Sequence, residues 1–149
     1  MEISAQGTLT LDSGAEPAQV SPNLFFDGPI PIVQVVHAGK KLQMMLDTGM
    51  TQTRLYPSIR DALAQWERDQ LTDSREAEFG GAGGSARAAF VFVPTIRLEL
   101  QCRAVYLSHI PLLSKAPAGA AGLRDGILGI DALAGGFRLD FRTMRLTLK

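Results

Sequence analysis

The stretch "IPIVQVVHAGKKLQMMLDTG", residues 30–49, predicts a β-hairpin whose second strand ends at an acid. Residues 30–36 are mostly apolar and β-branched, and "HAGKK" is typical of a tight turn that leads into "LQMML". Asp47 directly follows three apolar residues, at a point where burying a carboxylate would be costly. The strand must therefore direct Asp47 out of the core, either as an ordinary turn residue, a role that Asp suits, or as a group held there for chemistry.

The remaining sequence predicts short strands around one main helix. Pro57, Ile59, Leu63 and Trp66 indicate a helix over roughly 57–70, because Pro suits a first turn and the apolar residues recur at helical spacing. Strands are expected in "AAFVFV", "TIRLEL" and "AVYL", with a closing hairpin formed by "FRLDF" and "RLTL". We expect a loop at 111–124 and a short C-terminal helix at "ALAG". The predicted fold class is mostly β.

Composition excludes several classes of partner. The chain has 15 acidic and 15 basic residues, so we expect no binding to nucleic acid or to an anionic membrane. No stretch approaches the ~18–20 apolar residues of a membrane span. The N-terminal segment lacks the basic start and apolar centre of a signal peptide. Two localisations stay open: periplasmic or exported if the chain is a domain trimmed from a longer protein, and cytoplasmic otherwise.

We expect no metal and no other cofactor. Cys102 is the single cysteine, which excludes an internal disulfide and a Cys-rich zinc site, and we expect it to fill a small space in the core. His37 and His109 are too few and too isolated for zinc, and are predicted to lie in turns or at the surface. The glycines of 81–86 fit a dinucleotide-binding motif only loosely, because that motif must open a helix whereas a β-rich stretch follows here.

Two segments repeat one pattern. Both "MMLDTG" (44–49) and "DGILGID" (125–131) run apolar residues into a glycine turn, and only the first places an acid at the turn itself. Together with the glycine-rich "GGAGG" (80–84) and the closing "FRLDFRTMRLTL" (137–148), they resemble the retropepsin-like aspartic proteases, the single-domain, bacterial or retroviral-type branch. The resemblance implies a closed β-barrel domain over residues 26–149, preceded by an N-terminal arm or strand at residues 1–25.

The resemblance also implies roles for individual residues. Asp47 would be the catalytic general acid and base, Thr48 would hydrogen-bond across a dimer axis, and Gly49 would let the backbone turn tightly. The family mechanism needs two carboxylates, and one Asp-Thr-Gly per chain therefore implies a homodimer through the Asp47 loop. Asp131 is predicted to cap the short C-terminal helix rather than to supply the second acid. A flap over an extended polypeptide substrate would contain three glycines: Gly81, Gly83 and Gly84.

Two alternatives stay open beside the endopeptidase. Family members usually have a small residue directly after Asp-Thr-Gly, whereas this chain has Met50, which would narrow the groove or alter the dimer contact. The first alternative is therefore a non-catalytic retropepsin-like module for dimerisation or peptide binding. A weaker one is a small β-barrel that binds an apolar ligand, in which Asp47 is only a turn residue.

Overall fold

The hairpin predicted from residues 30–49 forms the centre of the fold. The computed structural model describes residues 1–11, 21–81, 84–101, 103–117 and 124–149. Strand β4 (Ile30–His37) pairs antiparallel with β5 (Lys40–Leu46), from Ile32 opposite Met45 to His37 opposite Lys40. Ala38 and Gly39 form the turn, both with positive φ, which matches the twist of a two-residue hairpin. The predicted hairpin is confirmed, and Asp47 follows its last residue.

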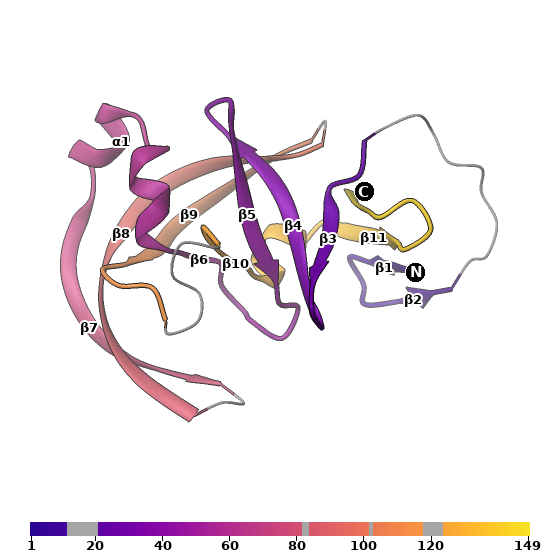
Figure 1. Cartoon of the computed structure of the whole chain (residues 1–149), viewed down its shortest axis with the longest axis horizontal. Coiled ribbons are helices and arrows are strands. Elements are labelled where there is room, and N and C mark those ends of the chain that lie inside the picture. The colour runs from indigo at the N-terminus through magenta and orange to yellow at the C-terminus, as the bar shows by residue number, and fades with distance from the viewer. Residues whose placement is uncertain (12–20, 82–83, 102, 118–123) are drawn as a thin grey trace.

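The hairpin is part of a closed barrel (Figure 1). Its sheet has the order β3-β4-β5-β10-β6-β9-β8-β7, and an additional pairing of Val36 in β4 with Glu99 in β8 closes the ring. The prediction of a mostly-β, closed-barrel fold is confirmed. The strands not yet bounded are β3 (Leu24–Asp27), β6 (Arg54–Leu55), β7 (Thr72–Gly81), β8 (Gly84–Leu100), β9 (Arg103–Leu113) and β10 (Gly126–Leu128).

A second, smaller sheet contains both ends of the chain. Its order is β12-β11-β1-β2, formed by β1 (Glu2–Ser4), β2 (Leu9–Thr10), β11 (Gly136–Asp140) and β12 (Arg145–Leu148). The β11–β12 pair confirms the predicted closing hairpin. The terminal ammonium of Met1 donates to the carbonyl of Leu139 (2.9 Å), so the first strand is attached to the last hairpin. The division of the chain between residues 25 and 26 stays a prediction.

The prediction of one continuous helix over residues 57–70 is wrong. The segment forms a 3₁₀ helix, η1 (Pro57–Asp61), and a separate α-helix, α1 (Gln65–Asp69), because Ala64 between them is extended (φ −65, ψ 160). The break also changes which side chains face inward: Trp66 is 58% exposed, whereas Glu67 is buried. The short C-terminal helix is confirmed as a 3₁₀ helix, η2 (Ile130–Leu133).

Two apolar clusters lie on opposite faces of the central strands. Successive side chains of a strand point to opposite faces, so Met44 and Leu46 join the main core while Met45 faces the other way. The main core also includes Leu55, Leu112 and Leu128. What we call the second cluster comprises buried Tyr56, Phe90, Leu113 and Ile127, with Met45, Met50, Ala88, Phe92 and Ala116 packed against them.

Candidate active site

Asp47 lies at the start of a tight turn that three hydrogen bonds define. The N–H of Asp47 donates to the carbonyl of Leu128 in β10 (3.1 Å), and the N–H of Met50 donates to the carbonyl of Asp47 (3.1 Å). The N–H of Gly49 donates to Oδ1 of the Asp47 carboxylate (2.9 Å). A Cβ at residue 49 would lie 3.2 Å from that same oxygen, so glycine gives the carboxylate room to approach the backbone. The turn thus holds one carboxylate oxygen of Asp47 in place.

The second copy of the repeated pattern supports the first. Strand β10 runs parallel to β5, with Ile127 opposite Met45 and Leu128 opposite Leu46. Beyond the strands, the N–H of Ile130 donates to the carbonyl of Met50 (2.8 Å), which attaches the far side of the turn. The two glycine turns that the sequence suggested as related are therefore packed side by side and joined by backbone hydrogen bonds.

Thr53 and Asp131 form a partly buried polar connection below the turn. The Thr53 hydroxyl donates to Oδ1 of Asp131 (2.7 Å) and accepts from the N–H of Gly129 (3.0 Å). A Cβ at Gly129 would lie 2.8 Å from the backbone of Gln52, so the two loops could not approach this closely with another residue there. Asp131 is not the helix cap that we predicted: the N-cap of η2 is Gly129, and the Asp131 carboxylate binds the Thr53 N–H (3.0 Å).

Asp47 and the second cluster lie on the same side of the sheet. Met45 and Asp47 are two residues apart along the extended end of β5, so we infer that they project to one face. Met45 and Met50, which precede and follow Asp47 in the sequence, both pack against the second cluster. Met50 is only partly exposed, because its side chain packs against this cluster. Met50, the residue directly after Asp-Thr-Gly, is thus part of the apolar surface of the second cluster.

A long hairpin of β7 and β8 extends from this floor (Figure 1). Its strands pair from Thr72 opposite Phe92 to Gly81 opposite Gly84. Phe90 near its base is buried in the second cluster, and Phe92 meets Phe90 edge to face with ring centroids 5.0 Å apart. Gly83, one of the predicted flap glycines, lies outside the described residues. The assignment of this hairpin as a substrate flap stays a prediction.

Arg54 interacts electrostatically with both Asp47 and Tyr56. Burial lowers the pKa of the Arg54 guanidinium, while Tyr56 and Asp47 nearby act in the opposite direction. Burial raises the pKa of the Tyr56 phenol, and the positive charges of Arg124 and Arg54 partly offset this effect. The sequence reasoning missed these residues. The segment Thr53–Tyr56 is too short to show a periodicity from which the face of each side chain could be predicted.

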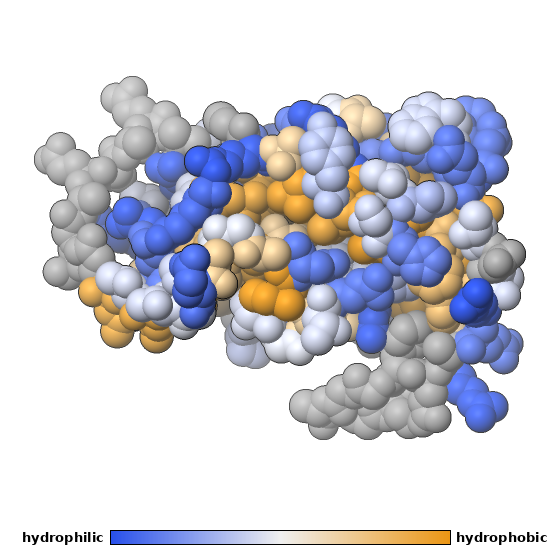
Figure 2. All heavy atoms as spheres, turned by 180° about the vertical axis from the view of Figure 1, so that it is seen from behind, coloured by the Kyte–Doolittle hydropathy of each residue, from blue (hydrophilic) through white to orange (hydrophobic). Residues whose placement is uncertain are grey.

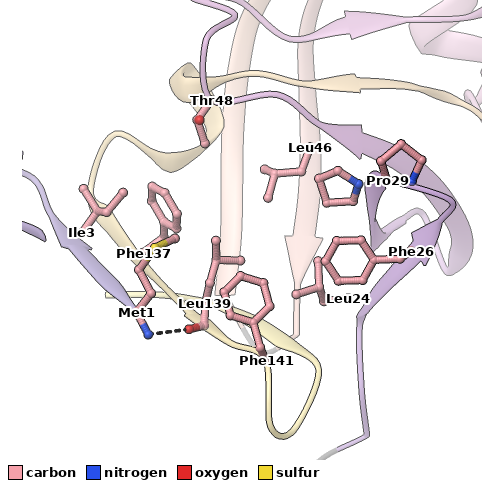
Figure 3. Close-up of a pocket in the computed structure, with 11 residues that line it drawn as sticks. Met1, Ile3, Leu24, Phe26, Pro29, Leu46, Thr48, Phe137, Leu139 and Phe141 are labelled. Atoms are coloured by element: carbon pink, nitrogen blue, oxygen red, sulfur yellow. Dashed lines mark hydrogen bonds between the residues drawn. The ribbon is translucent and has the colours of Figure 1, made fainter. Parts of the chain in front are cut away.

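Thr48 points away from the second cluster and toward an apolar groove (Figure 3). The groove has a volume of about 290 Å³, and Leu46, Phe137 and Phe141 line it with Thr48. Phe26 lies across from Phe141, with ring centroids 6.4 Å apart, and the two residues are 50% and 52% exposed. Seen from behind, hydrophobic atoms are also exposed at the end of the molecule that holds both termini (Figure 2). Asp47 and Thr48 therefore face two different apolar surfaces.

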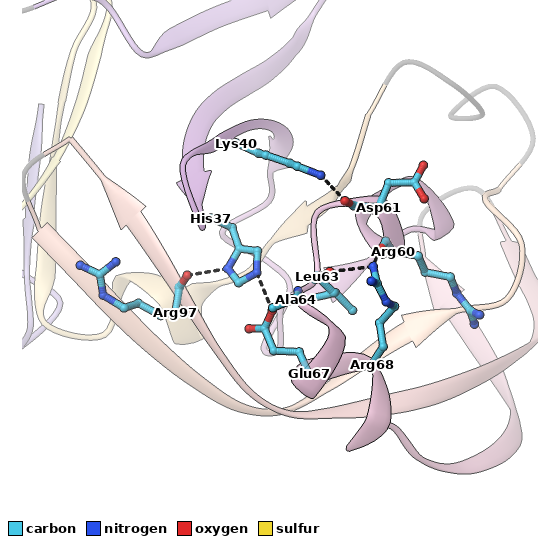
Figure 4. A network of polar contacts seen from close by, with 9 residues as sticks. All are labelled: His37, Lys40, Arg60, Asp61, Leu63, Ala64, Glu67, Arg68 and Arg97. Carbon is cyan, nitrogen blue, oxygen red and sulfur yellow. Dashed lines mark hydrogen bonds and ion pairs between the residues drawn. The ribbon is translucent and has the colours of Figure 1, made fainter.

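The histidines do not form a metal site in the described structure. In the parts of the chain that the structure describes, no group of three or more His, Cys, Asp or Glu residues is arranged to hold a metal ion. The prediction for His37 is wrong: its side chain is buried and lies between Glu67 (Nε2···Oε2 3.1 Å) and the carbonyl of Arg97 (3.0 Å), as Figure 4 shows. His109 is exposed and stacks on Phe92, and Cys102 lies outside the described residues.

No helix in the described ranges is long and apolar enough to span a membrane.

Comparison with known proteins gives one family and a set of similar structures. The model of a family described as aspartyl protease matches residues 33–132, which include the Asp47 turn, β10 and Asp131. Among 31 matching chains of solved structures is EIAV protease complexed with the inhibitor HBY-793. It is 18% identical, with 68% of this chain and 83% of that chain covered and a TM-score of 0.44. No curated protein matches the chain significantly.

Proposed function

The chain belongs to the aspartyl protease family, and we propose that it is an aspartic endopeptidase that acts as a homodimer. Asp47 of each copy would supply one carboxylate of the catalytic pair. The observation that carries the proposal is the Asp47 turn, in which a partly exposed carboxylate is fixed by the Gly49 N–H and by parallel strands β5 and β10. The second glycine turn, which is joined to the first by backbone hydrogen bonds, supports a fixed position for this acid.

The reaction follows from two carboxylates that share one proton. One carboxylate accepts a proton from the attacking water while the other donates a proton to the oxygen of the scissile carbonyl. Two acids this close cannot both ionise easily, so they titrate as a coupled pair. We therefore expect activity at acidic to mildly acidic pH. Gly49 orients Asp47 through its N–H, so the carboxylate meets the water in a defined direction.

The groove beside Thr48 supports the proposed dimer. Thr48 is exposed, and the apolar residues next to it include two half-exposed aromatic rings, Phe26 and Phe141. Exposed apolar surface of this kind is typical of protein interfaces. A two-fold axis beside Thr48 would bring the two Asp47 residues together and let each Thr48 hydrogen-bond across the interface. The substrate would then lie extended over the second cluster, below the β7–β8 hairpin, bonded through its main chain.

The substitution Asp47→Asn tests the proposal directly. Since the amide cannot serve as a general base, we expect cleavage of an unfolded, reduced and alkylated protein at pH 3–6 to fall by roughly 10²–10⁴-fold or more. Asp61→Asn is the matched control, because Asp61 is exposed on η1 and should leave the rate unchanged. We also expect the aspartic protease inhibitor pepstatin to reduce cleavage. Equal cleavage by the wild-type and Asp47→Asn chains, with circular dichroism showing both folded, would contradict the proposal.

The non-catalytic alternative predicts a different pattern. A retropepsin-like module for dimerisation or peptide binding would dimerise and bind peptides between pH 3 and pH 7 without cleaving them. Sedimentation and cleavage assays on the same preparation distinguish the two functions. The packing of Met50 against the second cluster favours the endopeptidase, because the side chain then lines the proposed substrate groove instead of blocking it.

A further inference from the structure

His37 and Glu67 form a buried contact that the proposed reaction does not use. Their side chains are 4% and 5% exposed, and Nε2 of the imidazole lies 3.1 Å from Oε2 of the carboxylate. His37 is the last residue of β4 and Glu67 belongs to α1, so the contact joins the central hairpin to the helix that precedes β7. Figure 4 shows the imidazole ring between Glu67 on one side and the carbonyl of Arg97 on the other.

The hydrogen-bond partners determine how many protons this contact holds. Nδ1 of His37 lies 3.0 Å from the carbonyl oxygen of Arg97, which can only accept, so Nδ1 carries a hydrogen. Without a proton between them, Nε2 and Oε2 of Glu67 would be two acceptors facing one another in a buried site. The contact therefore needs a second proton, which the imidazole and the carboxylate share as a coupled pair.

Charged residues on the neighbouring elements have partners of their own. Lys40 of β5 donates to the carbonyl of Asp61, and Arg68 of α1 donates to the carbonyl of Leu63 (2.7 Å). The side chain of Arg97 points away from His37 and forms an ion pair with Glu99 (Figure 4). The charged or titratable groups on the elements around the contact are Lys40, Lys41, Arg60, Asp61, Arg68, Asp69, Arg97, Glu99 and Tyr106.

Release of α1 would free the start of the long β7–β8 hairpin. Only Gln70 and Leu71 separate α1 from β7, and their N–H groups donate to the carbonyls of Glu67 (3.3 Å) and Arg68 (3.2 Å). Strand β7 is the last in the order of the main sheet, where it pairs with β8. The His37–Glu67 contact is thus an attachment of β7 to the barrel in addition to its pairing with β8.

We propose that the His37–Glu67 contact is a pH-sensitive latch, closed at mildly acidic pH and open at alkaline pH, that holds α1 and the start of β7 against the barrel. In the open form both side chains are solvated, and an exposed imidazole releases its proton above about pH 6.5. The closed form then holds one proton more than the open form. Closure therefore becomes less favourable as the pH rises, and each pH unit multiplies the opening constant by up to about tenfold.

The opposite change occurs in acid. Below about pH 4.3 an exposed carboxylate becomes protonated, so the open form then holds more protons than the closed form. Closure is therefore most favourable between about pH 4.5 and pH 6.5, the interval between the two ordinary values. This range overlaps the acidic to mildly acidic range expected for the proposed activity.

Hydrogen exchange of the wild-type chain tests the latch without any substitution. Exchange of the backbone amides of residues 64–71 is followed by mass spectrometry at pH 6, 7 and 8 and divided by the intrinsic exchange rate at each pH. We expect the protection of this segment to fall at least about fivefold between pH 6 and pH 8, because each opening releases a proton. The amides of β11 and β12 are the internal control and should keep their protection.

Two results would overturn the inference. One is equal protection of residues 64–71 at pH 6 and pH 8. The other is an equal loss of protection in residues 64–71 and in the β11–β12 hairpin, because the whole chain and not α1 would then respond to pH.

Glu67→Gln shows whether the shared proton causes the pH dependence. The amide keeps the size of the side chain and an oxygen that can accept from the N–H of Ala64, but it cannot share an ionisable proton with His37. We expect the protection of residues 64–71 to be lower than in the wild type at pH 6 and to change little between pH 6 and pH 8.

His109→Gln is the matched control. It removes the other histidine of the chain, which is exposed on β9, and should retain the pH dependence of the wild type. The full pH dependence in Glu67→Gln, or its loss in His109→Gln, would contradict the assignment of the latch to His37 and Glu67.

The latch and the proposed function can fail separately. A chain with the expected change in protection that cleaves no polypeptide would contradict the endopeptidase and leave the latch supported. An active endopeptidase whose residues 64–71 are equally protected at pH 6 and pH 8 would contradict the latch and leave the catalytic proposal intact.

Discussion

At the scale of single residues, the Asp47 turn depends on a buried threonine that is not part of the Asp-Thr-Gly triplet. Thr53 is fully buried, and its hydroxyl both donates to Asp131 and accepts from the N–H of Gly129. It therefore connects the loop that follows Asp47 to the second glycine turn. Asp131, which the sequence offered as a possible second acid, is a partner in this connection.

Thr53→Val removes the hydroxyl while keeping the shape of the side chain. The variant leaves the N–H of Gly129 without its partner, so we expect the free energy of unfolding to fall by roughly 1–3 kcal/mol. Urea denaturation followed by circular dichroism measures this change. Thr51→Val, in the exposed part of the same loop, is the control and should change stability by less than about 0.5 kcal/mol. A Thr53→Val chain as stable as the wild type would show that the connection contributes nothing.

At the scale of elements, α1 is held to the barrel by a buried polar contact rather than by an apolar face. Oε2 of Glu67 accepts from the N–H of Ala64 (2.7 Å), at the break between η1 and α1, and also contacts Nε2 of His37 (3.1 Å). The Nδ1 of His37 faces the carbonyl of Arg97, which can only accept, so this nitrogen carries the hydrogen. Glu67 and His37 together thus connect α1, β4 and β8 (Figure 4).

Glu67→Ala tests this connection. The substitution leaves the N–H of Ala64 and Nε2 of His37 without their Glu67 partner, and we expect a loss of roughly 1–3 kcal/mol in the free energy of unfolding. Gln65→Ala, at an exposed position of the same helix, should change stability by less than about 0.5 kcal/mol. Similar thermal midpoints for the two variants would mean that packing, not the polar contact, holds α1.

The same elements show how far sequence reasoning reaches. The β4–β5 hairpin, η2 and the β11–β12 hairpin could be predicted, because their signals are local: apolar runs, alternation and turn residues. The split helix and the exposure of Trp66 could not, because the break is stabilised by a contact between Glu67 and His37, 30 residues away. For the site, the Asp47 turn could be predicted from its triplet. Arg54 and Tyr56 could not, since their shared face with Asp47 arises only when β10 pairs with both β5 and β6.

At the scale of the whole molecule, the proposed active site is one that a single chain cannot complete. The barrel presents Asp47 at one end of β5, and the groove beside Thr48 exposes aromatic rings next to the sheet that contains both termini. The net charge is zero, so long-range electrostatic repulsion between two copies is small. We therefore place the proposed catalysis in the pair of chains rather than in one chain.

The measurement that tests this account most directly is a mixing experiment with wild-type and Asp47→Asn chains. The two are combined under conditions that dissociate dimers, returned to assay conditions at constant total protein, and assayed for cleavage of an unfolded protein. If each active site needs one Asp47 from each copy, only wild-type pairs are active and activity follows the square of the wild-type fraction. An equal mixture would then retain about one quarter of the wild-type activity, as random pairing of two copies requires. A linear decline, with half of the activity retained in the equal mixture, would contradict the shared catalytic pair.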